Sequence, residues 1–70
     1  MKVFYLTFGQ RSPFRNGWVE IIARSESEAR DCAFEALGDK WAFMYSEEKF
    51  TDRERSFFPT GKIGMSLSVE

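Results

Sequence analysis

The stretch SESEARDCAFEALG, residues 25–38, decides the fold because it predicts one amphipathic helix. Ser25 followed by Glu28 three residues later matches the capping box that begins helices, and Gly38 is typical of the residue just past a helix end. Small apolar residues recur at helical spacing and form the predicted buried stripe: Ala29, Cys32, Ala33, Ala36 and Leu37. The small residues of this stripe would let the helix pack closely on a sheet.

Strands are predicted on both sides of this helix. Residues 2–8 are rich in β-branched and aromatic side chains with two apolar faces, which predicts a central strand covered on each side. Residues 18–24 and 40–45 favour two further strands. Clean alternation over 62–69 predicts a half-solvated antiparallel strand. This order predicts an α+β fold, a four-stranded, mainly antiparallel β-β-α-β-β sheet with one helix on one face.

Alternation assigns side chains to faces in two of these strands. In the third strand, it places Trp41, Phe43 and Tyr45 on one side and Ala42 and Met44 on the other. In the last strand, the side chains predicted to point inward are Ile63, Met65, Leu67 and Val69. The charged connection between these strands is expected to hold a helical turn begun at Ser46, with Phe50 as its anchor.

The length of 70 residues predicts one domain, residues 1–70, with a modest core. Cys32 is the single cysteine and lies on the apolar stripe, so a disulfide framework is ruled out and a buried thiol is expected. No apolar run reaches the roughly 20 residues that cross a bilayer. We therefore expect a soluble, cytoplasmic chain without a membrane partner.

Chemistry-bearing residues are sparse. The sequence has no histidine, which removes the commonest general base and the commonest metal ligand. No catalytic residues, metal ligands or cofactor are predicted. A non-enzymatic binding protein is the function class that remains.

Charge is unevenly distributed along the chain. The net charge is −1, although residues 1–24 carry four bases against one acid and residues 25–54 carry nine acids against four bases. A general nucleic-acid binder usually shows a basic excess, so only a local positive patch is expected. Glu28, Asp31 and Glu35 share one helix face, either as a solvated surface or as an acidic patch that docks on a basic partner.

The loop over residues 9–17 is the first candidate site. Arg11 and Arg15 place two guanidinium groups between glycines, and Asn16 adds an amide, a combination that suits phosphate or carboxylate ligands. A solvated hairpin loop is the alternative interpretation.

The second candidate contact lies around the third predicted strand, where Trp41 and Tyr45 are followed by Glu47 and Glu48. Such rings are either core or stacking surfaces. Because one short helix does not cover both faces of a sheet, we expect apolar surface to remain for a partner or for a second copy of the chain.

The chain also resembles a family of small uncharacterised proteins encoded by bacteriophages and prophages. The matching stretches are FYLTFG (4–9), RNGWVEI (15–21), SESEAR (25–30) and LGDKWAFMY (37–45), followed by Glu47, Glu48 and Phe50. Similar proteins often carry Gly-His-Pro in the first loop, where this chain has Gly9-Gln10-Arg11-Ser12-Pro13. The resemblance implies a phage protein that works in the bacterial cytoplasm.

Three functions follow as expectations. The first is an accessory protein that binds a host protein or a small anionic ligand such as a nucleotide, in host takeover or counter-defence. The second is a nucleotide-binding or single-stranded nucleic-acid-binding module. The third is a minor structural component of the phage particle.

Overall fold

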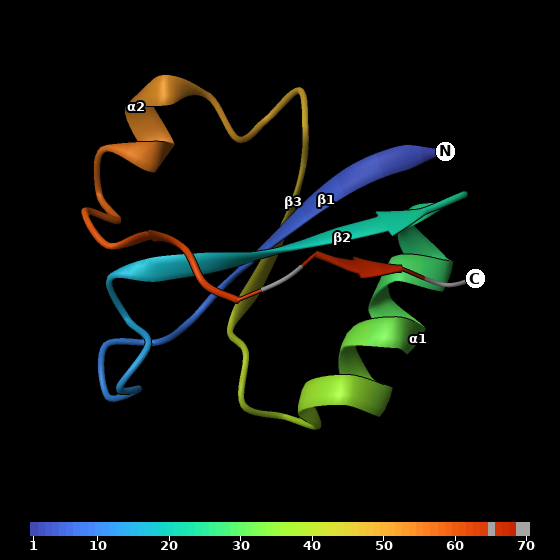
Figure 1. Ribbon diagram of the computed structural model, residues 1–70, viewed down its shortest axis with the longest axis horizontal. Coiled ribbons are helices and arrows are strands. Elements are labelled where there is room, and N and C mark those ends of the chain that lie inside the picture. The colour runs from blue at the N-terminus through green and yellow to red at the C-terminus, as the bar shows by residue number, and fades with distance from the viewer. Residues whose placement is uncertain (65, 69–70) are drawn as a thin grey trace.

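The computed structural model describes residues 1–64 and 66–68 and shows an α+β fold, in which a mixed five-stranded sheet carries a helix (Figure 1). Its elements in chain order are β1 (Lys2–Thr7), β2 (Gly17–Ala23), α1 (Glu26–Leu37), β3 (Phe43–Ser46), α2 (Asp52–Arg55), β4 (Gly61–Lys62) and β5 (Leu67–Ser68). Within the described residues, no helix is long and apolar enough to cross a membrane.

The centre of the sheet is β1, as its two apolar faces predict. It pairs antiparallel with β2 on one side and antiparallel with β3 on the other. Tyr5, for example, lies opposite Glu20 of β2 and Tyr45 of β3. The strand order β3-β1-β2 leaves the far edge of β2 for the C-terminal segment.

Helix α1 begins and ends where the sequence predicts. The Ser25 hydroxyl accepts a hydrogen bond from the Glu28 backbone N–H at 3.2 Å, and the Glu28 carboxylate accepts one from the Arg24 N–H at 3.1 Å. Gly38 ends the helix with a φ of 62°, in the left-handed region that favours glycine. These local bonds satisfy N–H groups that a helix terminus otherwise leaves unpaired.

The first face of the sheet packs against α1. Ala29 and Ala33 are completely buried, and their small side chains let the helix lie close to Leu6 and Ile21. Phe4, Phe8, Val19 and Ala23 complete this buried cluster. Cys32 and Leu37 are half-buried at its border, whereas Ala36 is exposed, so the predicted apolar stripe is confirmed except at Ala36. The Cys32 thiol, which was expected to be buried, keeps partial exposure.

The second face is covered by the connection that follows β3. Phe50 is 1% exposed, and its ring centroid lies 4.7 Å from that of Tyr5 and 5.3 Å from that of Trp18. The Arg55 guanidinium lies over the same three rings, 5.2 Å from the Tyr5 centroid. Phe50 is the predicted anchor, and the predicted turn at Ser46 is present, because the Ser46 carbonyl accepts hydrogen bonds from the N–H groups of Lys49 and Phe50, each at 3.0 Å. The short helix α2 follows this turn and begins after Thr51.

The third strand is shorter than predicted, and Trp41 lies outside it. Trp41 precedes β3 and packs against the helix-side core together with Met44, whereas Tyr45 faces Phe50 on the second face. The prediction that Trp41 and Tyr45 share a side is therefore wrong. The chain enters β3 irregularly, with the Ala42 N–H donating to the Thr7 carbonyl at 2.8 Å, and a strict two-residue alternation does not extend through this point.

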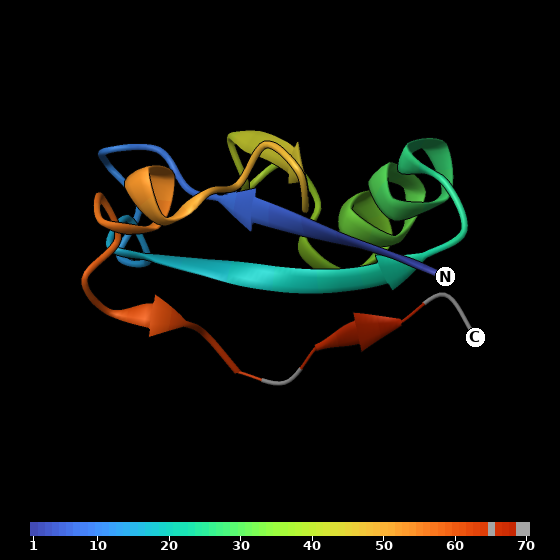
Figure 2. The same cartoon turned by 90° about the horizontal axis from the view of Figure 1, so that it is seen from above.

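The predicted last strand consists of two short strands, β4 and β5, which pair parallel with β2 rather than antiparallel (Figure 2). The turn after Phe58 delivers the chain to the beginning of β2, where the Thr60 N–H donates to the Asn16 carbonyl at 2.8 Å. A strand that starts beside the beginning of β2 must run parallel to it. Met65 and Val69, two of the predicted inward residues, lie outside the described residues.

Candidate functional site

The first loop is a chain of hydrogen-bonded turns rather than an open strand connection. Backbone N–H groups of Ser12, Arg15 and Gly17 donate to carbonyl groups three residues earlier, at 3.0–3.2 Å. The Phe14 N–H also donates to the Ser12 hydroxyl at 3.1 Å. This local bonding leaves the Arg11 and Arg15 side chains exposed on a loop of defined shape.

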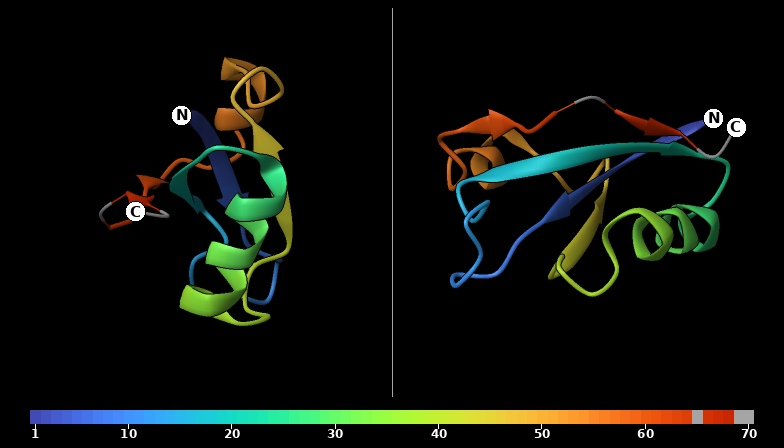
Figure 3. Two further views of the ribbon diagram at one scale, coloured as in Figure 1. Left: turned by 90° about the vertical axis from the view of Figure 1, so that its right-hand side faces the viewer. Right: turned by 60° about the horizontal axis from the view of Figure 1, so that its bottom comes forward.

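The loop lies at the end of the molecule opposite α1, together with the segment that contains α2 (Figure 3, right). Between the loop, β3 and this segment the surface forms a cleft of about 470 Å³. We call it the loop-end cleft, and its lining includes Gln10, Arg15, Asn16, Phe43, Tyr45, Glu54, Phe57 and Phe58. Pockets that bind small molecules typically have volumes of about 300–1,000 Å³, so this cleft is of ligand size.

Aromatic rings form much of the cleft. Phe43 is 65% exposed and Phe57 is 67% exposed, which are the highest values among the large hydrophobic side chains described. Tyr45 and Phe58 are half-buried, and their rings pack on Phe50 at centroid distances of 5.5 and 6.0 Å. The cleft thus has a supported aromatic floor and two exposed rings that offer faces for stacking.

Two charges of opposite sign line the same cleft, Arg15 and Glu54. The Thr51 hydroxyl donates a hydrogen bond to the Glu54 carboxylate, and this bond holds the pKa of that carboxyl below its ordinary value. Glu54 is therefore ionised at neutral pH. A ligand that carries both an anionic group and hydrogen-bond donors matches this pair.

Arg11, predicted for the loop site, and Trp41, predicted for the contact around the third strand, line a neighbouring hollow that shares Gly9 with the loop-end cleft. Trp41 is half-buried there, and its ring lies 5.2 Å from the ring of Phe34 on α1. The structure thus brings Arg15, Asn16 and Tyr45 into one cleft and places Arg11 and Trp41 beside it.

Glu47 and Glu48 are not part of this arrangement. They line a separate hollow together with Met1, Lys2 and Glu26, next to the N-terminal end of β1. The antiparallel pairing of β3 with β1 carries the chain away from the loop end, so residues after Ser46 emerge beside Val3 rather than beside Thr7.

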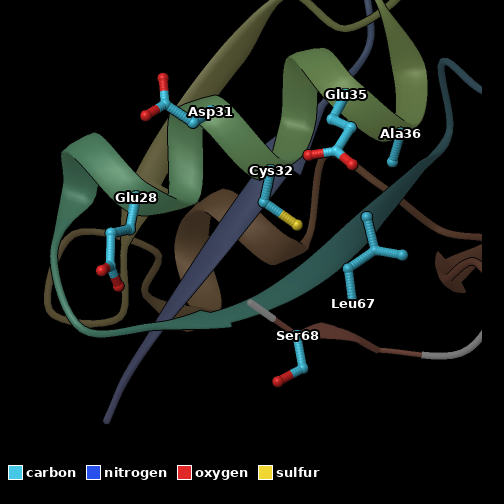
Figure 4. A pocket seen from close by; sticks show the side chains of 7 residues that line it. All are labelled: Glu28, Asp31, Cys32, Glu35, Ala36, Leu67 and Ser68. Carbon is cyan, nitrogen blue, oxygen red and sulfur yellow. The ribbon is translucent and has the colours of Figure 1, made fainter. Parts of the chain in front are cut away.

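A groove between α1 and β5 collects the predicted acidic helix face (Figure 4). Glu28, Asp31 and Glu35 line it, with the Cys32 thiol on the side of the helix that faces Leu67. Partial burial, and secondarily the negative charge of Glu35, raises the pKa of this thiol. Cys32 is therefore a protonated thiol at neutral pH rather than a reactive thiolate.

Sequence reasoning missed Glu54 and Phe57 as lining residues. Glu54 lies in the four-residue helix α2 and Phe57 in the turn after it, and elements this short have no periodicity that indicates which side chains point toward the loop. One signal was present in the sequence, namely the two consecutive phenylalanines Phe57 and Phe58. Consecutive side chains in a turn point in different directions, so one ring of such a pair tends to remain outside the core.

No protein-family model matches the chain, and comparison with curated proteins and with solved structures found no match. Among residues 1–64 and 66–68, no group of three or more His, Cys, Asp or Glu side chains is placed to hold a metal ion.

Proposed function

We propose that this protein is a non-enzymatic binding protein that contacts its partner through the loop-end cleft. The supporting observation is that Phe43 and Phe57, each about two-thirds exposed, line the same cleft as Arg15. Burying a phenylalanine contributes about 1.5–3 kcal/mol, a large gain for a 70-residue chain. Phenylalanine and arginine are both enriched in protein interfaces relative to the rest of the surface, and this cleft combines two exposed phenylalanines with an arginine.

The partner that we propose is a host protein or a small anionic ligand, and the setting is a phage protein in the bacterial cytoplasm. The setting derives from the resemblance of residues 3–50 to phage proteins and not from the cleft. Host takeover and counter-defence are the roles that fit a small accessory protein of this kind. A structural role in the phage particle is the alternative, and the presence of the chain in purified particles would support it.

Capture from bacterial lysate tests this function for any partner that the lysate contains. Immobilised wild-type protein is compared with Phe57→Ala and Arg15→Ala, and retained proteins and small molecules are identified by mass spectrometry. Matched controls come from α1: Phe34 is 53% exposed, and Arg30 pairs only weakly with Glu26 at 3.7 Å. We expect a species that Phe34→Ala and Arg30→Ala retain and that both cleft variants lose. Identical retention by all five proteins would refute the proposal.

The exposed rings of the loop-end cleft could also bind a second copy of the chain and form a dimer. A solution mass of twice 8.2 kDa that falls to the monomer value in Phe43→Ala and Phe57→Ala would show that the cleft is a dimer contact. A monomeric wild-type protein would leave the cleft available to other partners.

A further inference from the structure

We propose that the loop-end cleft binds a guanine nucleotide, with the base stacked on the exposed phenylalanines, the phosphate on Arg15 and the base edge on Glu54. This inference rests on the proposed binding function and names its ligand. Each of the three contacts follows from a separate feature of the cleft.

Stacking is the first contact. A nucleobase offers two flat faces, and Phe43 and Phe57 offer the two most exposed rings of the described chain within one cleft. Stacking of a base on an aromatic side chain strengthens binding by about 5- to 150-fold per ring. Because Tyr45 and Phe58 support the floor through Phe50, the cleft is held in shape before any ligand enters.

The phosphate contact is supplied by the first loop. The exposed guanidinium of Arg15 presents a planar fork of donors, which suits bidentate contact with phosphate oxygens. Gln10 and Asn16 line the same side of the cleft and add amide donors. The turns of the loop fix the backbone from which these side chains extend, so little ordering is required on binding.

Base selectivity arises from Glu54, an acceptor in a cleft whose other charged lining residue is Arg15. On its Watson–Crick edge guanine presents two adjacent donors, N1–H and the exocyclic N2 amine. Adenine and cytosine present one amine beside an acceptor, and uracil presents one N–H between two carbonyls. A carboxylate that accepts two parallel hydrogen bonds therefore prefers guanine.

The Thr51 hydroxyl orients the Glu54 carboxylate and helps to keep it ionised. Since the pKa of Glu54 lies below its ordinary value, binding of guanosine, which has no phosphate to titrate, should weaken only when this carboxyl becomes protonated at acidic pH. The phosphate of GMP changes its charge at about pH 6, so GMP binding should also respond to pH through the contact with Arg15.

Charge favours a short ligand over a long nucleic acid strand. The whole chain has a net charge of −1, and within the cleft Glu54 offsets Arg15. Binding along a polyanionic backbone requires several basic contacts. One arginine matches one phosphate group, as in a mononucleotide or at the end of an oligonucleotide.

Isothermal titration calorimetry of the full chain with GMP, AMP, CMP and UMP tests the inference. We expect GMP to bind at least about ten-fold more tightly than the others. Phe57→Ala should weaken all four nucleotides, and Arg15→Ala should weaken GMP but not guanosine. Glu54→Gln should remove the preference for GMP while leaving weak binding of every base, and Phe34→Ala and Arg30→Ala should bind like wild type. Far-UV circular dichroism spectra that match the wild type confirm that each variant is folded, since Phe34→Ala removes a ring that contacts Trp41 and so changes tryptophan emission by itself.

Equal affinity for the four nucleotides, or no heat with GMP at millimolar concentration, would overturn the guanine inference. A guanine-ended oligonucleotide that binds with a steep salt dependence, where GMP does not bind, would also overturn it in favour of a nucleic acid strand. If nucleotides fail while lysate capture still depends on Phe57 and Arg15, the proposed binding function stands and only its ligand is wrong.

Discussion

Replacing Phe50 with alanine should remove most of the stability of this protein. The ring is 1% exposed, and its centroid lies within 6.0 Å of the rings of Tyr5, Trp18, Tyr45 and Phe58. Truncation of a buried phenylalanine to alanine costs about 3–5 kcal/mol. The upper part of this range is expected here, because the second face of the sheet loses the side chain on which its other rings converge.

The destabilisation expected for Phe50→Ala is large compared with the total free energy of unfolding. A 70-residue domain has a free energy of unfolding of about 4–10 kcal/mol. The Phe50→Ala variant should therefore be partly unfolded in buffer, while Phe50→Leu, which keeps more of the volume, should lose only about 1–2 kcal/mol. Phe43→Ala is the matched control, since that ring is 65% exposed and its loss should change stability by less than about 0.5 kcal/mol.

Urea unfolding followed by tryptophan fluorescence measures all three variants. Trp18 contacts Phe50 edge-on and reports directly on the second face. A cost below about 1 kcal/mol for Phe50→Ala, or equal costs for Phe50→Ala and Phe43→Ala, would refute the assignment of Phe50 as the centre of this face.

Three further outcomes follow from single contacts. Gly17→Ala should destabilise the protein by about 1–3 kcal/mol, because a Cβ atom there would lie 2.5 Å from the Ile63 side chain and 2.8 Å from the Gly61 carbonyl oxygen. In an Ile63→Ala background the fall of the urea midpoint should be smaller but not abolished, since the clash with the Gly61 carbonyl remains, and no fall in either background would contradict both contacts. The pH midpoint of Cys32 alkylation by iodoacetamide should lie above the ordinary cysteine pKa. Glu35→Gln should lower this midpoint only in part, because burial of the thiol is the larger cause of the raised pKa. A wild-type midpoint at the ordinary value would show that neither burial nor Glu35 raises the pKa. Arg55→Lys should lower the free energy of unfolding in urea by about 1 kcal/mol, since a compact ammonium group does not stack over several rings as a guanidinium does. An unchanged urea midpoint would show that this stacking does not stabilise the second face of the sheet.

The parts of the fold that could be predicted from the sequence are those decided by neighbouring residues. Helix α1 begins at a hydrogen bond between Ser25 and Glu28 and ends at Gly38, and all three are visible as a local pattern. The central position of β1 was also predictable, because a strand with two apolar faces must be covered twice.

Strand direction at the far edge of β2 could not be predicted. Alternation over residues 62–69 describes which side chains are apolar, and it is the same for parallel and antiparallel pairing. Direction depends instead on where the turn before Gly61 delivers the chain. That position depends on Phe50, which packs on the distant rings of Tyr5 and Trp18, and on Phe58, which packs on Phe50.

The loop side of the candidate site could be predicted from the sequence, whereas the side formed by Glu54 and Phe57 could not. Arg15 and Asn16 stand between glycines in a polar loop, a pattern that indicates a site. Glu54 and Phe57 reach the cleft only because the connection after β3 folds back across the second face. Such a return depends on tertiary packing, which residue periodicity does not report.

The loop-end cleft is assembled from three stretches of chain that are far apart in sequence, within residues 7–16, 43–45 and 54–58. An unfolded chain therefore has no such cleft, and any occupant must raise the melting temperature. At a ligand concentration of 100 times Kd the gain is about 2.7 kcal/mol. For a domain of this size, that gain corresponds to a shift of roughly 10–20 °C. A thermal-shift screen of metabolites and peptides can therefore find the natural occupant of this cleft even if its chemistry is unlike that of a nucleotide.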